Sequence, residues 1–179
     1  MQECQLGRDK GVRKLAIVVA MIVAVMLQST ICSLWPWIGV KPDLVTVIVI
    51  LAGLLYGLVP GGMIGFAGGL LLDYSAGRLL GAGAVSRMLI GGLSGWVAPR
   101  IFGDHILVPP MAVLIGTWLE QSAYLFLVNA FGGSISIVRS FWTTILPVGL
   151  VNVLFAFPVQ YSLLVLERRF SRRGSAENG

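Results

Sequence analysis

Residues 57–73 read GLVPGGMIGFAGGLLLD, an apolar stretch in which glycine recurs at every fourth position. The series consists of Gly57, Gly61, Gly65 and Gly69, and the same interval continues with Asp73, Gly77 and Gly81. Residues four apart share one face of a helix, and small residues on such a face let two helix backbones approach closely in lipid. The stretch therefore predicts a helix packed tightly against another, either within its own bundle or from a partner protein.

The rest of the chain is equally apolar. Of its 179 residues, 56% are hydrophobic and 12% are charged, and the mean hydropathy is +0.88. A soluble domain of this size has too little interior to bury so much apolar surface. A helix needs roughly 20 apolar residues to cross a bilayer, so the length accommodates about six spans with short loops.

We therefore expect an all-α membrane protein, a bundle of about six transmembrane helices. The apolar segments are residues 15–34, 44–58, 61–72, 79–98, 106–131 and 141–166. They form one transmembrane domain, residues 15–166, between a basic N-terminal tail, residues 1–14, and a basic and polar C-terminal tail, residues 167–179. The second and third segments are short and rich in glycine, so a single re-entrant hairpin is an alternative for them.

The net charge of +5 comes from basic residues that flank the predicted spans. With both termini in the cytoplasm, nine of these residues lie inside, three lie outside and Arg87 lies within the membrane, which accounts for all 13. An excess of Lys and Arg on the cytoplasmic side is the usual pattern. The basic residues behind the pI of 9.7 thus reflect the orientation of the spans in the membrane. We therefore expect no binding of nucleic acid.

Two ionisable residues, Arg87 and Glu120, fall inside predicted spans, where a charge is costly and usually has a partner. At ~1.5 Å per residue, both residues lie at similar depth in the membrane. We predict an intramembrane ion pair that fixes helix register, with a proton or ligand site as the alternative. Asp73, at the outer end of the third span, is either a structural contact or a water-facing carboxylate.

Residues that could support catalysis or cofactor binding are scarce. His105 is the single histidine, so neither a histidine metal cluster nor a Ser-His-Asp arrangement is expected. The sequence has no Gly-x-x-x-x-Gly-Lys loop for a nucleotide. In the last span, Pro147 and Pro158 predict kinks, and Asn152 predicts a hydrogen bond to another helix. We expect a protein that is not an enzyme and has no cofactor.

Several motifs occur in an order that resembles a known family. Residues 41–44 read KPDL, and Pro42, Asp43 and Leu44 begin the second span; Tyr56 and Gly57 end it. The sequence GFAGGLLLD follows at residues 65–73. This order resembles the MreD family, the small membrane proteins of the bacterial rod-shape system, over residues 15–100; the remainder agrees in hydropathy and length.

The resemblance implies a role without catalysis in cell-wall elongation at the bacterial inner membrane. The implied partners are MreC, bound directly, and RodA with a class B penicillin-binding protein, besides membrane lipid. It also implies a fold similar to the substrate-binding components of energy-coupling-factor transporters. The alternative is such a vitamin-capture component, for which Ala16, Ala20 and Ala24 would form the face that docks a coupling subunit.

Overall fold

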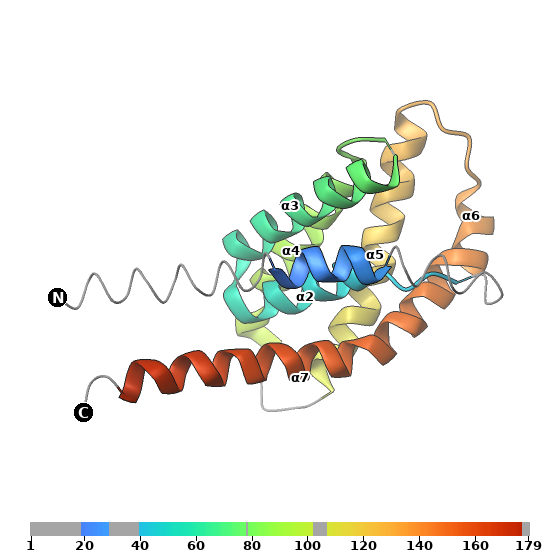
Figure 1. Ribbon diagram of the computed structural model, residues 1–179. Coiled ribbons are helices and arrows are strands. Elements are labelled where there is room, and N and C mark those ends of the chain that lie inside the picture. The colour runs from blue at the N-terminus through green and yellow to red at the C-terminus, as the bar shows by residue number, and fades with distance from the viewer. Residues whose placement is uncertain (1–18, 29–39, 78, 102–106, 177–179) are drawn as a thin grey trace.

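The computed structural model describes residues 19–28, 40–77, 79–101 and 107–176, and these residues form helices and turns without a β-strand (Figure 1). The longer helices are α2 (Leu44–Tyr56), α3 (Leu58–Ala76), α4 (Ala82–Ile101), α5 (Val108–Ala130) and α7 (Leu146–Ala176). A short helix α6 (Ile137–Ser140) and a π-helical turn η1 (Phe141–Ile145) lead into α7, and a helical segment, Val19–Gln28, precedes α2. The predicted all-helical class is confirmed.

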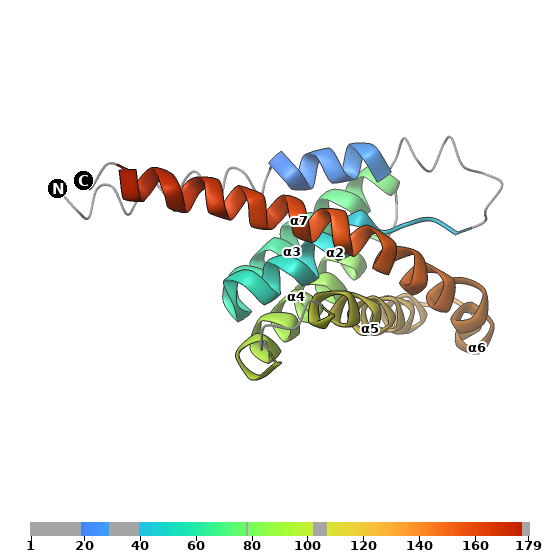
Figure 2. The same cartoon turned by 90° about the horizontal axis from the view of Figure 1, so that it is seen from below.

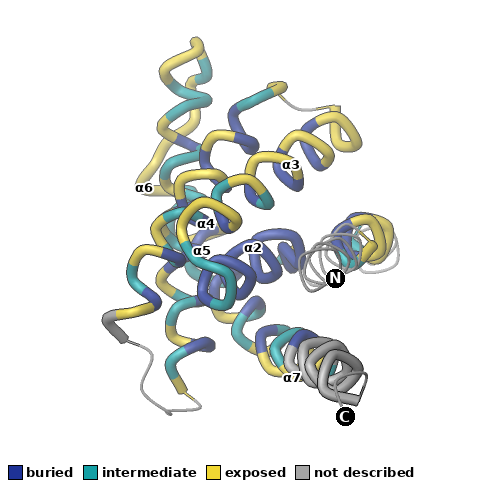
Figure 3. The backbone as a smooth tube through the Cα atoms, turned by 90° about the vertical axis from the view of Figure 1, so that its left-hand side faces the viewer, coloured by how far each residue is buried: buried dark blue, intermediate teal, exposed yellow. Residues whose placement is uncertain are grey.

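Helix α2 forms the centre of the bundle. Its residues from Leu44 to Leu54 are all buried, and it contacts α3, α4, α5 and α7 (Figure 3). A helix that is apolar on every side is stable only when neighbours surround it, and the run LVTVIVILAGLL meets this condition. Met21, Ala24 and Val25 of the segment Val19–Gln28 join the same apolar core.

Two helical stretches are long and apolar enough to cross a membrane by themselves, Val108–Ala130 and Ile137–Leu163. Helix α2 is apolar but has 13 residues, which gives about 20 Å at 1.5 Å per residue. The hydrocarbon core is about 30 Å thick. Six membrane crossings therefore remain a prediction.

Some predicted boundaries are wrong. The third segment, predicted as residues 61–72, is the 19-residue α3, which begins at Leu58 and places Pro60 in its first turn, where proline is tolerated. Gly57, with a φ of 93°, is the sole residue between α2 and α3, so the two helices form a tight hairpin. The predicted C-terminal tail is helical as far as Ala176.

The kink predicted at Pro147 takes the form of the π-helical turn η1, which ends one residue before α7 and two residues before Pro147. Proline lacks the amide hydrogen that would close an ordinary helical turn, and a wider turn before it accommodates the loss. Pro158 lies inside α7, which continues beyond it.

Candidate functional site: a glycine seam and a charge cluster

The predicted glycine face of α3 packs against α4 of the same chain. We call this contact the glycine seam; it joins Gly61, Gly65 and Gly69 of α3 to the stretch of α4 from Gly83 to Gly91. A methyl group added to Gly69 would lie 2.5 Å from the Cα atom of Ala84, and one added to Gly65 would lie 2.6 Å from the carbonyl carbon of Arg87. The neighbours are backbone atoms, which cannot turn aside as a side chain can. Of the two predicted readings, packing within the bundle is therefore the correct one.

At its two ends, the fourfold glycine series lies in turns and not on the face of a helix. Gly57, Gly77 and Gly81 have φ values of 93°, 59° and 99° and lie in turns, where glycine is favoured because it tolerates positive φ. For Gly77 and Gly81 the predicted role in helix packing is wrong for this reason. Gly57 lies in a turn and also packs against α4, because a methyl group added to Gly95 would collide with the backbone of Gly57. The fourfold spacing at these positions coincides with the turns that bound α3 and begin α4.

Sequence reasoning missed Gly53 of α2, which completes the seam. A methyl group on Gly61 would lie 2.7 Å from the Cα atom of Gly53, and one on Gly53 would collide with the carbonyl oxygen of Gly91. Three helix backbones therefore meet at Gly53, Gly61 and Gly91. Gly53 follows Ala52 in an otherwise aliphatic run, and a lone glycine inside a helix was the available signal.

The buried polar residues converge beside the seam, in what we call the charge cluster: Asp43, Asp73, Arg87 and Glu120. Each of the four is at most 5% exposed. Arg87 lies at the centre, and its Nη1 is 3.5 Å from Oε1 of Glu120. The structure thus brings together the two residues that the depth argument paired.

The closest partner of Arg87 is nevertheless Asp43, whose Oδ2 lies 2.6 Å from Nη2. Asp43 was predicted only as part of the motif with Pro42 and Leu44. The reason for the difference is the start of α4, which is Ala82 and not residue 79. Arg87 therefore lies nearer to the end of its helix at which α2 begins.

Asp43 also organises the start of α2. Its Oδ1 accepts a hydrogen bond from the backbone N–H of Thr46 at 3.0 Å, which makes it the N-cap of the helix. Its own backbone N–H donates to Oδ1 of Asn152 at 2.9 Å, and Nδ2 of Asn152 donates to Oγ1 of Thr117 at 3.1 Å. The predicted hydrogen bond of Asn152 to another helix is present, and the residue joins α7 to both α2 and α5.

Asp73 caps a helix other than its own. Its Oδ2 accepts from the backbone N–H groups of Gly81, Gly83 and Ala84 at 3.1, 2.9 and 3.3 Å, at the start of α4. With 1% of its surface exposed, Asp73 is a structural contact and not a water-facing carboxylate. A side chain at Gly83 would collide with Oδ1 of Asp73 and with Nη1 of Arg87, so this glycine keeps the two charges close.

The charge balance of the cluster depends on helix ends. Three carboxylates and one guanidinium leave a formal charge of −2 (one positive minus three negative). Asp43 and Asp73 each accept hydrogen bonds at a helix N-terminus, where the backbone carries about half a positive charge. Ser86 adds a hydrogen bond to Oε1 of Glu120 at 3.2 Å. The cluster is thus held by backbone groups as well as by Arg87.

Of the remaining residues that the sequence singled out, some lie outside the part of the chain that the structure describes. His105 and Ala16 are outside the described residues. Ala24 is 4% exposed and faces the bundle interior, and Ala20 is half-buried. Leu44 is buried at the start of α2, and Pro42 precedes the Asp43 cap and is also buried. No group of histidine, cysteine or acidic side chains suited to a metal ion occurs among the described residues.

Comparison of the chain with protein-family models, with curated proteins and with solved structures found no match.

Proposed function

We propose that this chain is a scaffold without catalytic activity, of the MreD type, in the bacterial inner membrane. In this role it binds MreC directly and supports RodA and its class B penicillin-binding protein during cell-wall elongation. The observation that carries the proposal is that the interior polar groups bind one another. Asp43, Arg87, Glu120 and Asn152 are each at most 5% exposed and are joined by hydrogen bonds and ion pairs.

The residues behind the family resemblance are also those that hold the helices together. Asp43, from the KPDL motif, caps α2 and binds Arg87. Gly65 and Gly69, from the GFAGGLLLD motif, form the seam with α4, and Asp73 caps α4. A rigid bundle assembled through these motifs suits a protein whose task is to hold a partner in place.

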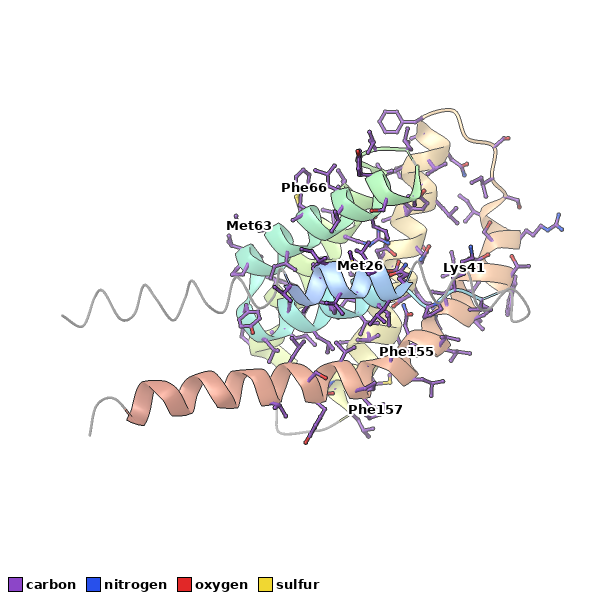
Figure 4. All side chains as sticks on the ribbon, in the orientation of Figure 1. Met26, Lys41, Met63, Phe66, Phe155 and Phe157 are labelled. Carbon is purple, nitrogen blue, oxygen red and sulfur yellow. The ribbon has the colours of Figure 1, made fainter. Side chains whose placement is uncertain are left out.

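The outer surface supports a lipid environment. Met63 and Phe66 lie on the outer side of α3 and are 69% and 44% exposed (Figure 4). Leu93 and Trp96 of α4 are 48% and 51% exposed. Large apolar patches on a surface mark contact with membrane or protein. Together with α5 and the stretch Ile137–Leu163, these faces support the proposed membrane placement. The proposed cytoplasmic position of both termini is supported by the basic residues of the sequence.

The alternative, a vitamin-capture component of an energy-coupling-factor transporter, has less support. A capture component needs polar groups that line a cavity open to the outside, whereas Arg87 and Glu120 are 2% and 1% exposed. The alanine face assigned to docking a coupling subunit includes Ala24, which packs in the core.

Co-purification tests the proposal. The chain with a C-terminal tag, expressed in rod-shaped bacteria, should recover MreC from solubilised membranes, and its depletion should round the cells. Topology is checked with reporter fusions after Gly179 and near Gly133, of which the first should be active in the cytoplasm and the second outside. Normal rods and no recovered MreC, together with loss of vitamin uptake on depletion, would favour the transport alternative.

A further inference from the structure

We infer that the exposed tyrosine and tryptophan side chains meet the lipid headgroups on the two faces of the membrane and so fix the depth at which the bundle lies. Tyr74 and Trp142 mark the outer level, and Trp96 and Tyr161 mark the cytoplasmic level. Their assignment rests on the membrane placement proposed above but not on the identity of the partner proteins. These side chains belong to neither the glycine seam nor the charge cluster.

Few tyrosine and tryptophan side chains are exposed. The exposed fraction is 77% for Tyr74, 51% for Trp96, 66% for Trp142 and 71% for Tyr161. Among the residues that the structure describes, no other tyrosine or tryptophan is exposed. Each of the four combines an apolar ring with a hydroxyl or N–H group that needs a polar partner. Such side chains gather where the hydrocarbon of a membrane meets the headgroups.

Two of the four residues lie on one continuous helical stretch. Trp142 is in η1, and Tyr161 follows 19 residues later in α7. At 1.5 Å per residue their separation is about 28 Å, close to the hydrocarbon thickness of about 30 Å. The large exposed apolar side chains between them are Leu150, Leu154 and Phe157, none of which has a polar group. The stretch therefore presents an apolar surface of membrane thickness between two amphipathic rings.

Helices α3 and α4 give a second, independent distance. They pack antiparallel along the glycine seam, where a methyl group on Gly95 would collide with the backbone of Gly57. Trp96 therefore lies level with Gly57. Tyr74 lies 17 residues after Gly57, at the other end of α3, which corresponds to about 25 Å. Two pairs of residues on different helices thus define nearly the same thickness.

The four residues also lie at matching ends of the bundle. Figure 1 shows α3 running toward the side where α6 lies, and Figure 2 shows α7 running from α6 to the opposite side. Tyr74, near the end of α3, and Trp142, just after α6, are therefore on the α6 side. Trp96 and Tyr161 come 14 and 15 residues after the first residues of α4 and α7, the helices that run away from that side.

This placement puts the charge cluster just beneath the outer headgroups. Asp73 directly precedes Tyr74 in α3. Asp43, the N-cap of α2, lies 14 residues before Gly57, or about 21 Å from the cytoplasmic level, compared with about 25 Å for Tyr74. A charge is most costly at the centre of the bilayer. The depth of these carboxylates thus helps to explain how a cluster with an excess of negative charge is tolerated in a membrane.

The test measures the depth of single tryptophans in the full chain, which has five. Changing four of them to phenylalanine leaves Trp96 or Trp142 alone, and Tyr74→Trp and Tyr161→Trp are each made in a chain without other tryptophans. The variants are reconstituted in phosphatidylcholine vesicles that carry bromine either near the headgroup or near the end of the acyl chains. We expect a larger loss of fluorescence with bromine near the headgroup for all four, because their rings lie at that depth.

The matched controls are Phe66→Trp and Leu150→Trp, each in the chain without other tryptophans. Both positions are exposed; Phe66 lies eight residues from Tyr74, and Leu150 lies eight residues from Trp142. Here bromine near the end of the acyl chains should cause the larger loss. The same depth at all six positions would overturn the inference, and so would little quenching by either lipid at the four proposed sites, which would show that protein and not lipid covers them.

Nitroxide labels provide a second measurement if a tryptophan variant does not fold. Single cysteines at the same six positions, in a chain with Cys4→Ser and Cys32→Ser, carry the label. The ratio of its accessibility to oxygen over that to a water-soluble nickel complex increases with depth, so it should be lower at the four sites than at the two controls. A ratio as high as that of the controls would overturn the inference. Failure of MreC to co-purify would count against the proposed scaffold and leave the measured depths unaffected.

Discussion

Helices α3 and α4 meet backbone to backbone, whereas α5 and α7 contact their neighbours through side chains. At the glycine seam, an added methyl group would press on the Cα atom of Ala84 or on the carbonyl group of Arg87. At Gly116 of α5 it would meet Cδ1 of Ile50, and at Gly149 of α7 it would meet the ring of Trp118. Backbone contacts leave no freedom for adjustment, while side chains can change rotamer.

The two regions show two ways in which helices associate in a chain that buries little polar surface. Close backbone contact maximises dispersion attraction where both helices offer small residues. Polar side chains give specificity where larger residues hold the helices apart, because each buried donor needs one particular acceptor. Arg87 belongs to both regions, since its carbonyl group lies against Gly65 and its guanidinium binds Asp43.

Loss of Arg87 should have the largest effect. Arg87→Met leaves Asp43 and Glu120 buried without their counter-charge, and breaking a buried pair from one side costs about 3–5 kcal/mol. We expect little folded protein and a lower midpoint of thermal unfolding in detergent. The double variant Arg87→Met with Glu120→Met should recover only part of the loss, because Asp43 is still buried without its closest partner.

A double-mutant cycle sharpens this prediction. The coupling free energy of Arg87 with Asp43, measured with Asp43→Asn, should exceed its coupling with Glu120, measured with Glu120→Gln, because the distances are 2.6 and 3.5 Å. Additive losses for both pairs would show that neither interaction contributes to stability.

The glycine seam should give the next largest effect. Gly65→Ala forces apart two backbones and should lower the free energy of unfolding by about 2–3 kcal/mol, and Gly65→Leu should prevent folding. The control is Gly62→Ala on the same helix, where the nearest atom would be 3.6 Å away. That variant should be neutral or slightly stabilising, since alanine favours helix. Equal stability of Gly65→Ala and Gly62→Ala would refute backbone contact at the seam.

The sequence predicted the helical class and most of the helix positions, since apolar length is a local property. It also predicted the seam, because fourfold glycine spacing is visible without knowledge of the neighbour. It did not separate Gly61, Gly65 and Gly69 from Gly77 and Gly81, which serve turns at positive φ. The end of α3 at Ala76 follows from Gly77, a left-handed C-cap.

The charge cluster was predicted in part. Depth along the membrane normal suggested Arg87 and Glu120 as partners, but depth does not reveal which helices are neighbours or how each is rotated. The pairing of Arg87 with Asp43 depends on the packing of α2 against α4. The capping of α4 by Asp73 depends on the short turn that follows α3. Both are tertiary features.

Asp73 should show an intermediate effect. Asp73→Asn keeps one acceptor oxygen but loses the negative charge at the N-terminus of α4, and we expect a loss of about 1–2 kcal/mol in the free energy of unfolding. Asp73→Ala, which removes all three hydrogen bonds, should cost more. Thermal unfolding in detergent compares the two variants, and a loss no greater for alanine than for asparagine would contradict the capping role.

The smallest effect should come from the hydrogen bond between Asn152 and Thr117, which joins α7 to α5. Thr117→Val keeps the shape of the side chain and removes the acceptor oxygen for Nδ2 of Asn152. Hydrogen bonds between membrane helices contribute about 0.6 kcal/mol on average, so a loss near this value is expected, well below that of Gly65→Ala. Ser122→Ala is the control on the same helix, because the hydroxyl of Ser122 is exposed and binds only the carbonyl oxygen of Trp118 one turn earlier. A cost for Thr117→Val as large as that of the seam variant would show that α5 and α7 depend on polar contacts as strongly as α3 and α4 depend on close packing.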